Sequence, residues 1–160
     1  GEVLDNILKA GLRAPDHGTL TPWQFILFEG EGRERLGDLL AEAARARGED
    51  EESIKKCQEA PLRAPLVVAV ATRYQRHPKV PKLEQELSAG CALMAMQMAA
   101  QAQGFNGIWR SGWFIFDELI NKGLALAPED QLVGFLYLGT PMLEARKLRE
   151  LPIADFVRRF

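Results

Sequence analysis

Two short segments combine residue types that can hold an anionic or redox-active ligand. Arg13 and His17 place a cation and an imidazole four residues apart, just after a helical pattern ends. Trp109, Arg110 and Ser111 place an aromatic ring, a guanidinium and a hydroxyl before a glycine, at the end of a short strand-like run. Such groups can stack on a ligand, hydrogen-bond to it and neutralise its charge, and ligands often bind beside strand ends in open sheets.

Each segment also has a purely structural interpretation. Arg13 can complement the negative end of the preceding helix, while Asp16 begins a turn. Trp109 can be a core residue that is followed by a surface turn. Taken one at a time, the two segments leave both interpretations open.

The common catalytic and metal-binding motifs are missing. The two histidines lie far apart with no His-Glu-x-x-His pattern, which argues against a zinc hydrolase. The two cysteines, Cys57 and Cys91, form no Cys-x-x-Cys motif, so neither a metal site nor a disulfide framework is expected. The glycines at 30, 32 and 37 have the wrong spacing for a dinucleotide fingerprint. We therefore assign no catalytic acid–base residue and no metal ligand.

Length and charge set the broad class. The 160 residues are 47% hydrophobic, and 20 basic against 22 acidic side chains leave a net charge of −2. A chain of this size buries one core, so a single domain over residues 1–160 is expected. With this charge balance the chain has no excess of positive charge to bind the phosphates of nucleic acid, so we expect no nucleic-acid partner. There is no signal-peptide pattern, and the most apolar segment, 87–102, is shorter than the ~20 residues of a membrane span, so we expect a cytoplasmic protein with no membrane partner.

Hydrophobic periodicity predicts the elements that must position these residues. Apolar and β-branched runs indicate strands, and spacing of three and four residues indicates helices. The predicted strands cover 23–28, 66–72, 108–109 and 131–138, and the predicted helices cover 3–12, 36–44, 53–59, 83–103 and 117–122. Strands that alternate with helices favour a fold of mixed class, α+β with a central helix.

The longest predicted helix, Leu83 to Gln103, is small and apolar nearly all round. A helix of this composition is expected to be buried on every side, and Cys91 with it. Its three closely spaced methionines are interpreted as core filling rather than as a cofactor site.

Four ordered segments together resemble the nitroreductase family, and most closely its small YdjA-like subgroup. They are Arg13–His17 followed by Thr21–Phe25, then Glu84–Ala100, Gly107–Gly112 and Val133–Pro141. The resemblance covers the chain from about Gly1 to Phe160. It implies a nitroreductase-like α+β fold, in which helices flank a central mixed or antiparallel sheet and the long central helix is buried.

The resemblance also implies a homodimeric flavoenzyme with FMN at the subunit interface. Hydride would pass from NAD(P)H through FMN to a nitroaromatic or quinone-like acceptor in a ping-pong reaction. Arg13 and His17 would contact FMN held mainly by the other subunit, and Trp109, Arg110 and Ser111 would line the flavin. The family segment sometimes linked to NAD(P) corresponds here to Ala99, Ala100, Gln101, Ala102, Gln103 and Gly104.

The Arg-Arg-Ser-like motif with which this family grips the FMN phosphate has no counterpart in the sequence. Two expectations follow. Either residues upstream of Gly1 supply that grip, or the chain binds FMN weakly. The second possibility leaves an alternative function, a non-catalytic or weakly flavin-binding dimeric protein.

Overall fold

Strand β2 (Leu66–Thr72) lies inside a four-stranded sheet whose order is β1-β2-β4-β3. The computed structural model describes all 160 residues. The other strands are β1 (Trp23–Glu29), β3 (Asn106–Arg110) and β4 (Leu132–Gly139), and every pairing is antiparallel. From Val67 onward each residue of β2 is buried, which explains why this strand reads as an apolar run without alternation. The four predicted strands are confirmed to within a few residues.

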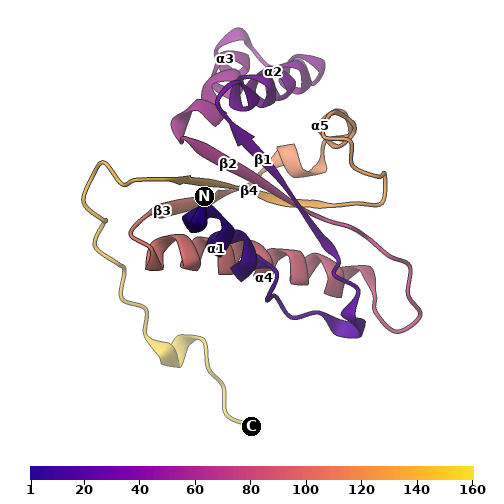
Figure 1. Ribbon diagram of the computed structural model, residues 1–160, viewed down its shortest axis with the longest axis vertical. Coiled ribbons are helices and arrows are strands. Elements are labelled where there is room, and N and C mark those ends of the chain that lie inside the picture. The colour runs from indigo at the N-terminus through magenta and orange to yellow at the C-terminus, as the bar shows by residue number, and fades with distance from the viewer.

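Helices cover both faces of the sheet (Figure 1). On one face lie α1 (Glu2–Gly11) and α4 (Lys82–Ala102); on the other lie α2 (Glu31–Ala46) and α5 (Glu118–Gly123), with α3 (Glu51–Glu59) packed against α2. Each face has its own core cluster, because alternate residues of β2 point to opposite sides. The predicted α+β class, with helices flanking the sheet, is confirmed.

Local hydrogen bonds set where the shorter helices begin. The carboxylate of Asp50 accepts from the backbone N–H of Ser53 at 2.7 Å and caps α3. Asp117 caps α5 in the same way, accepting from Leu119 and Ile120. Single 3-10 turns lie at η1 (His17–Thr19), η2 (Ala60–Arg63), η3 (Trp113–Phe116) and η4 (Ile153–Asp155). No helix combines the length and the apolar character that crossing a bilayer requires.

Helix α4 differs from its prediction. One side faces the sheet and α1 and is buried, through residues such as Ala89, Leu93 and Met96. The opposite side is exposed, and we call its five residues the α4 stripe: Leu83, Leu87, Cys91, Met94 and Met98. The expectation of burial on every side is wrong for the single chain, because α1 and the sheet cover only one side. The expected burial of Cys91 is wrong for the same reason, and of the three methionines expected to fill the core only Met96 is buried.

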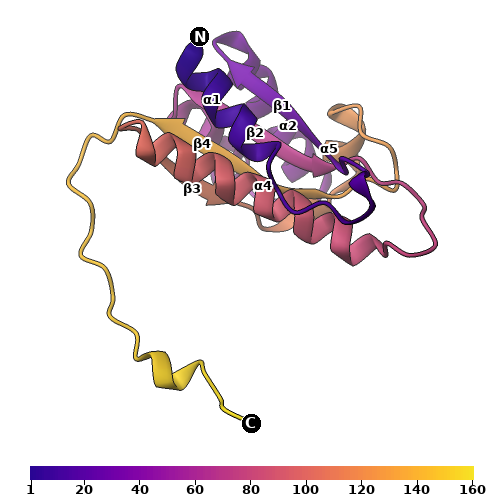
Figure 2. The ribbon, with the colours of Figure 1, turned by 60° about the horizontal axis from the view of Figure 1, so that its bottom comes forward.

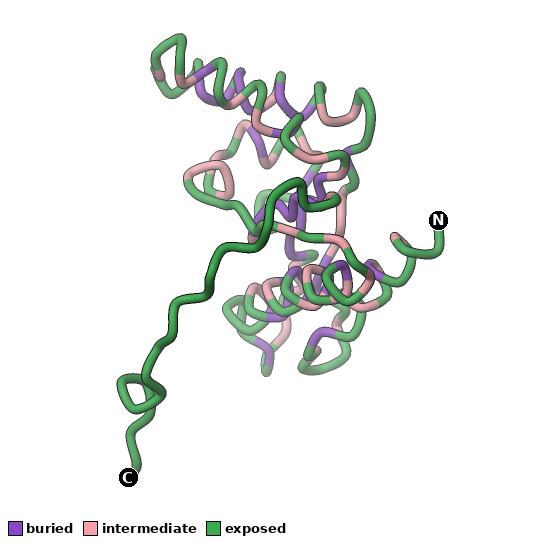
Figure 3. Tube along the Cα trace, turned by 90° about the vertical axis from the view of Figure 1, so that its left-hand side faces the viewer, coloured by how far each residue is buried: buried purple, intermediate pink, exposed green.

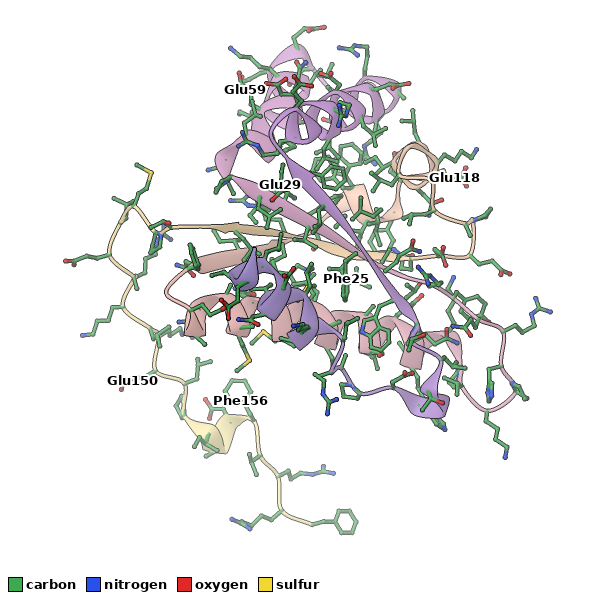
Figure 4. All side chains as sticks on the ribbon, viewed as in Figure 1. Phe25, Glu29, Glu59, Glu118, Glu150 and Phe156 are labelled. Carbon is green, nitrogen blue, oxygen red and sulfur yellow. The ribbon has the colours of Figure 1, made fainter.

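Residues 141–160 leave the body as an extended arm (Figures 2 and 3). Every residue of the arm is exposed, and η4 is its only regular element. Figure 4 shows Glu150 and Phe156 on the arm, well away from Phe25 in the body. The last buried residue is Leu138, so the sheet and both cores are complete before the arm begins.

Candidate functional site

Strand β3 holds Trp109 at the edge of the sheet, on the side of α4. Trp109 lies opposite Leu136 of β4, and β3 has no second neighbour. The indole Nε1 donates to the carbonyl oxygen of Val133 at 3.1 Å. Although this hydrogen bond fixes the ring, 40% of the residue remains exposed. Trp109 therefore presents an anchored, partly open aromatic surface.

Arg110 leaves the strand on the opposite face, because successive side chains of a strand alternate. Its guanidinium carbon lies 5.6 Å from the centre of the Tyr137 ring. Burial raises the pKa of the Tyr137 phenol, and the positive charges of Arg110 and Arg63 oppose that rise. The phenol is therefore neutral at physiological pH, and Arg110 interacts with the ring as a cation with a π system. No carboxylate pairs with Arg110.

Arg13 and His17 lie on the loop between α1 and β1, against the N-terminal half of α4. The Ser88 hydroxyl donates to the carbonyl of Pro15. His17 Nδ1 lies 2.6 Å from Glu84 Oε2, so the imidazole is tied to the first turn of α4. Both contacts join the loop to the same helix, while Arg13 stays exposed and has no ion-pair partner.

The same loop holds an unusual backbone conformation. Gly18, Thr19 and Thr21 all have positive φ, which side-chain-bearing residues rarely adopt. The Asp16 carboxylate fixes the turn by accepting from the backbone N–H groups of Leu20 and Thr21, each at 2.9 Å. Backbone strain of this kind persists only where surrounding contacts enforce it, and it clusters at functional sites.

The Arg13 loop and Trp109 lie on either side of the α4 stripe. Ser88 contacts the loop, whereas a Cβ at Gly90 would lie 3.4 Å from the Trp109 ring. Successive helix residues are ~100° apart, so these two positions point away from each other and the stripe lies between them. The chain does not bring its two candidate segments together. A second copy seated on the stripe would lie next to both.

The surroundings of Trp109 fit a flat cofactor with a hydrogen-bonding edge. The open edge of β3 leaves backbone N–H and C=O groups without a strand partner. At the end of the strand, Gly112 has a φ of +92° and a Cβ there would meet no atom within 4 Å, so the backbone is approachable. Two cations without an ion-pair partner lie further off: Arg110 on the opposite face of the strand and Arg13 on the other side of the α4 stripe. No group of three or more His, Cys, Asp or Glu side chains is placed to bind a metal.

Ala99 to Gly104 form the C-terminal turn of α4 and the residue that ends it, at the far end of this helix from His17. Gln103 fastens this turn to α1, accepting from Asn6 at 3.2 Å, and donates to the carbonyl of Ala99 at 3.1 Å. Because a helix C-terminus carries negative partial charge, the turn does not favour a phosphate group.

Comparison with known proteins identifies the chain's relatives. Residues 1–140, which form the whole packed body, match the model of the nitroreductase family. The chain belongs to the nitroreductase family. This nitroreductase is 51% identical over 152 residues to "Putative NAD(P)H nitroreductase YdjA" of Escherichia coli K12, a match that covers 95% of this chain and 83% of that protein.

Solved structures of low identity share the fold of this nitroreductase. A nitroreductase-like family protein from Bacillus cereus matches with a TM-score of 0.84 at 22% identity, over 99% of this chain and 84% of that one. A variant of the FMN and NADPH-dependent nitroreductase NfnB from Sphigopyxis sp. strain HMH matches with a TM-score of 0.74 at 18% identity, over 98% and 87%. The predicted nitroreductase-like fold is confirmed.

Sequence reasoning missed three residues that hold the candidate side chains of this nitroreductase: Glu84, Gly90 and Gly134. Glu84 pairs with His17 across a long stretch of chain, and no local pattern signals such a pair. Gly134, by contrast, interrupts a strand of bulky residues. A glycine inside a strand often marks a close approach, and this signal was available in the sequence.

Proposed function

We propose that this nitroreductase is an FMN-dependent oxidoreductase that uses NAD(P)H to reduce a nitroaromatic or quinone-like acceptor. The observation that carries the proposal is the anchored, partly open indole of Trp109 at a free sheet edge. The 51% identical relative, named for NAD(P)H, and the FMN and NADPH-dependent NfnB support the same donor and cofactor. A cytoplasmic location is part of the proposal, since NAD(P)H is a cytoplasmic reductant and both cysteines are free thiols.

When bound, FMN would supply the redox chemistry, which is hydride transfer between NAD(P)H and the acceptor, and the proposed order of the two half-reactions is ping-pong. The chain supplies binding and orientation. Trp109 would offer a flat surface, and the open backbone groups of β3 would bond to the edge of the ring system. Arg110 and Ser111 would lie at the end of that strand, while Arg13 and His17 of a second chain would complete the site. No acid–base pair is required of the protein.

NAD(P)H is assigned to Ala99–Gly104 only through the family resemblance. The negative end of α4 points there. A dinucleotide would therefore have to meet this turn through its nicotinamide or ribose rather than through its phosphates.

FMN binding tests the proposal directly. We expect the purified protein to be yellow, or to take up one FMN per chain, and to bind riboflavin more weakly because the unpaired Arg13 charge favours the phosphate. Isothermal titration with both flavins measures the difference, and Arg13→Gln should reduce it. Equally weak binding of both flavins would favour the alternative, a non-catalytic member of the family.

We also propose that the α4 stripe is the subunit interface of a homodimer. Its Leu and Met side chains are 48–63% exposed, and the five residues of the stripe follow one another at spacings of three and four, as in helix–helix contacts. Large apolar stripes of this kind are rarely left open to water. The stripe also lies between Trp109 and the Arg13 loop, so a second copy placed there can join two incomplete halves into one site.

Cys91 provides a test of this interface. It lies near the middle of the stripe, between Leu83 and Met98, and in a two-fold symmetric contact the central residue approaches its own copy. We expect light scattering to show a dimer at micromolar concentration and a short bismaleimide to cross-link it. Cys91→Ser should abolish the cross-link and Cys57→Ser should preserve it. A monomer, or a dimer that Cys91 fails to link, would contradict this interface.

A further inference from the structure

Gly134 lies in β4 directly beneath the Trp109 indole. A Cβ at this position would lie 2.6 Å from Cδ1 of Trp109 and 3.1 Å from Cδ1 of Leu93, and would overlap the indole Nε1 even more closely. Real Cβ atoms essentially never show contacts under 3.0 Å. The indole therefore occupies the space that any side chain at position 134 would need.

One hydrogen bond and two glycines define the place of the indole. Its Nε1 donates to the carbonyl of Val133, the residue just before Gly134. At its far edge, a Cβ added to Gly90 of α4 would lie 3.4 Å from Cη2, an ordinary packing distance. The ring therefore lies close to Gly134 of β4 on one side and beside Gly90 of α4 at its far edge.

We infer that Gly134 is a positioning residue for the flavin site. Because it has no side chain, it lets the Trp109 indole approach β4 closely enough to bond to Val133, and so sets where the exposed part of the ring meets the cofactor. Gly134 acts only through Trp109 and touches no ligand itself. This inference rests on the proposed function, in which Trp109 lines the flavin.

The Gly134→Ala change should displace the indole. Leu93 is fully buried and closes the other side of the space, so the ring cannot shift sideways and keep its bond to Val133. We expect FMN affinity to fall about tenfold in Gly134→Ala and by a similar factor in Trp109→Ala. The double variant should bind FMN no more weakly than Trp109→Ala, because two changes acting through one contact are not additive.

Gly139→Ala is the matched control. A Cβ at Gly139, in the same strand, is also crowded, at 2.8 Å from the Pro65 side chain, but it does not meet Trp109. This variant should lower the melting temperature without weakening FMN binding. Full additivity in the double variant, or equal loss of FMN affinity in Gly139→Ala, would show that Gly134 has only a structural role.

A second measurement separates this inference from the proposed function. Acrylamide quenching of tryptophan fluorescence measures how exposed the Trp109 indole is in the flavin-free protein. The contribution of Trp109 is the part of the quenchable emission that is lost in Trp109→Phe. Gly134→Ala should increase quenching of this part, and unchanged quenching would overturn the inference. If the unchanged protein fails to bind FMN but quenching is still higher in Gly134→Ala, the proposed function is wrong, whereas the positioning of Trp109 by Gly134 is supported.

Discussion

Arg110→Ala should weaken FMN binding, or slow flavin reduction by NAD(P)H, at least tenfold, with little change in the melting temperature of the apoprotein. Arg110 is exposed, has no ion-pair partner, and its guanidinium carbon lies 5.6 Å from the centre of the Tyr137 ring. An exposed substitution of this kind usually changes stability by less than ~0.5 kcal/mol. Loss of a hydrogen bond to a charged partner costs about 1.5–3 kcal/mol, and each 1.4 kcal/mol is about a factor of ten.

The experiment combines a flavin titration with anaerobic stopped-flow reduction. Arg63→Ala is the control, because Arg63 also acts on Tyr137 electrostatically but belongs to η2 and not to the Trp109–Ser111 segment. We expect Arg63→Ala to behave as the unchanged protein does. If Arg110→Ala retains both affinity and reduction rate, Arg110 is a solvated surface residue and the structural interpretation of this segment holds.

Gly37→Ala should lower the free energy of unfolding by about 1–3 kcal/mol, the usual cost of overfilling a packed contact. Gly37 is on α2, and a Cβ there would overlap the backbone carbonyl oxygen of Gln58 on α3. Backbone atoms cannot turn aside as a flexible side chain can, so one helix must shift. For a chain of this size, the expected loss in melting temperature is about 2–12 °C.

Gly32→Ala should have the opposite sign. Gly32 lies in the first turn of the same helix, and the nearest atom to its added Cβ would be the Arg35 guanidinium at 3.9 Å. Alanine in an unstrained helical position stabilises by about 0.4–1 kcal/mol. Thermal unfolding of both apoproteins measures the contrast. Equal effects of the two changes would mean that α2 and α3 are not in close contact in solution.

The strands were predictable because the residue types within each strand already indicate which of its faces are buried. The run from Leu66 to Thr72 is apolar on both faces, and it forms β2 over those same residues. Helix α4 was located to within a residue, yet its surroundings were not. Small apolar residues on every side of a helix indicate that something covers it, but they do not distinguish the chain's own sheet from a second molecule.

The candidate site shows a similar division. Residue types identified Trp109 and Arg110, and the two-residue period of a strand would have placed them on opposite faces. The bond from His17 to Glu84 and the contact of Trp109 with Gly134 join distant parts of the chain. Contacts of that kind depend on how elements pack in three dimensions, and the spacing of residues within one element does not predict that packing.

The order of the strands has a consequence for how the molecule forms. Each pair of neighbouring strands is separated in the sequence by at least one helix, so the sheet contains no tight hairpin. Val67, for example, must find Tyr137 before the centre of the sheet exists. Such a high contact order places folding in the range of about milliseconds to seconds. A nascent chain cannot close its sheet until β4 has left the ribosome, and until then the apolar β2 has no partner on that side.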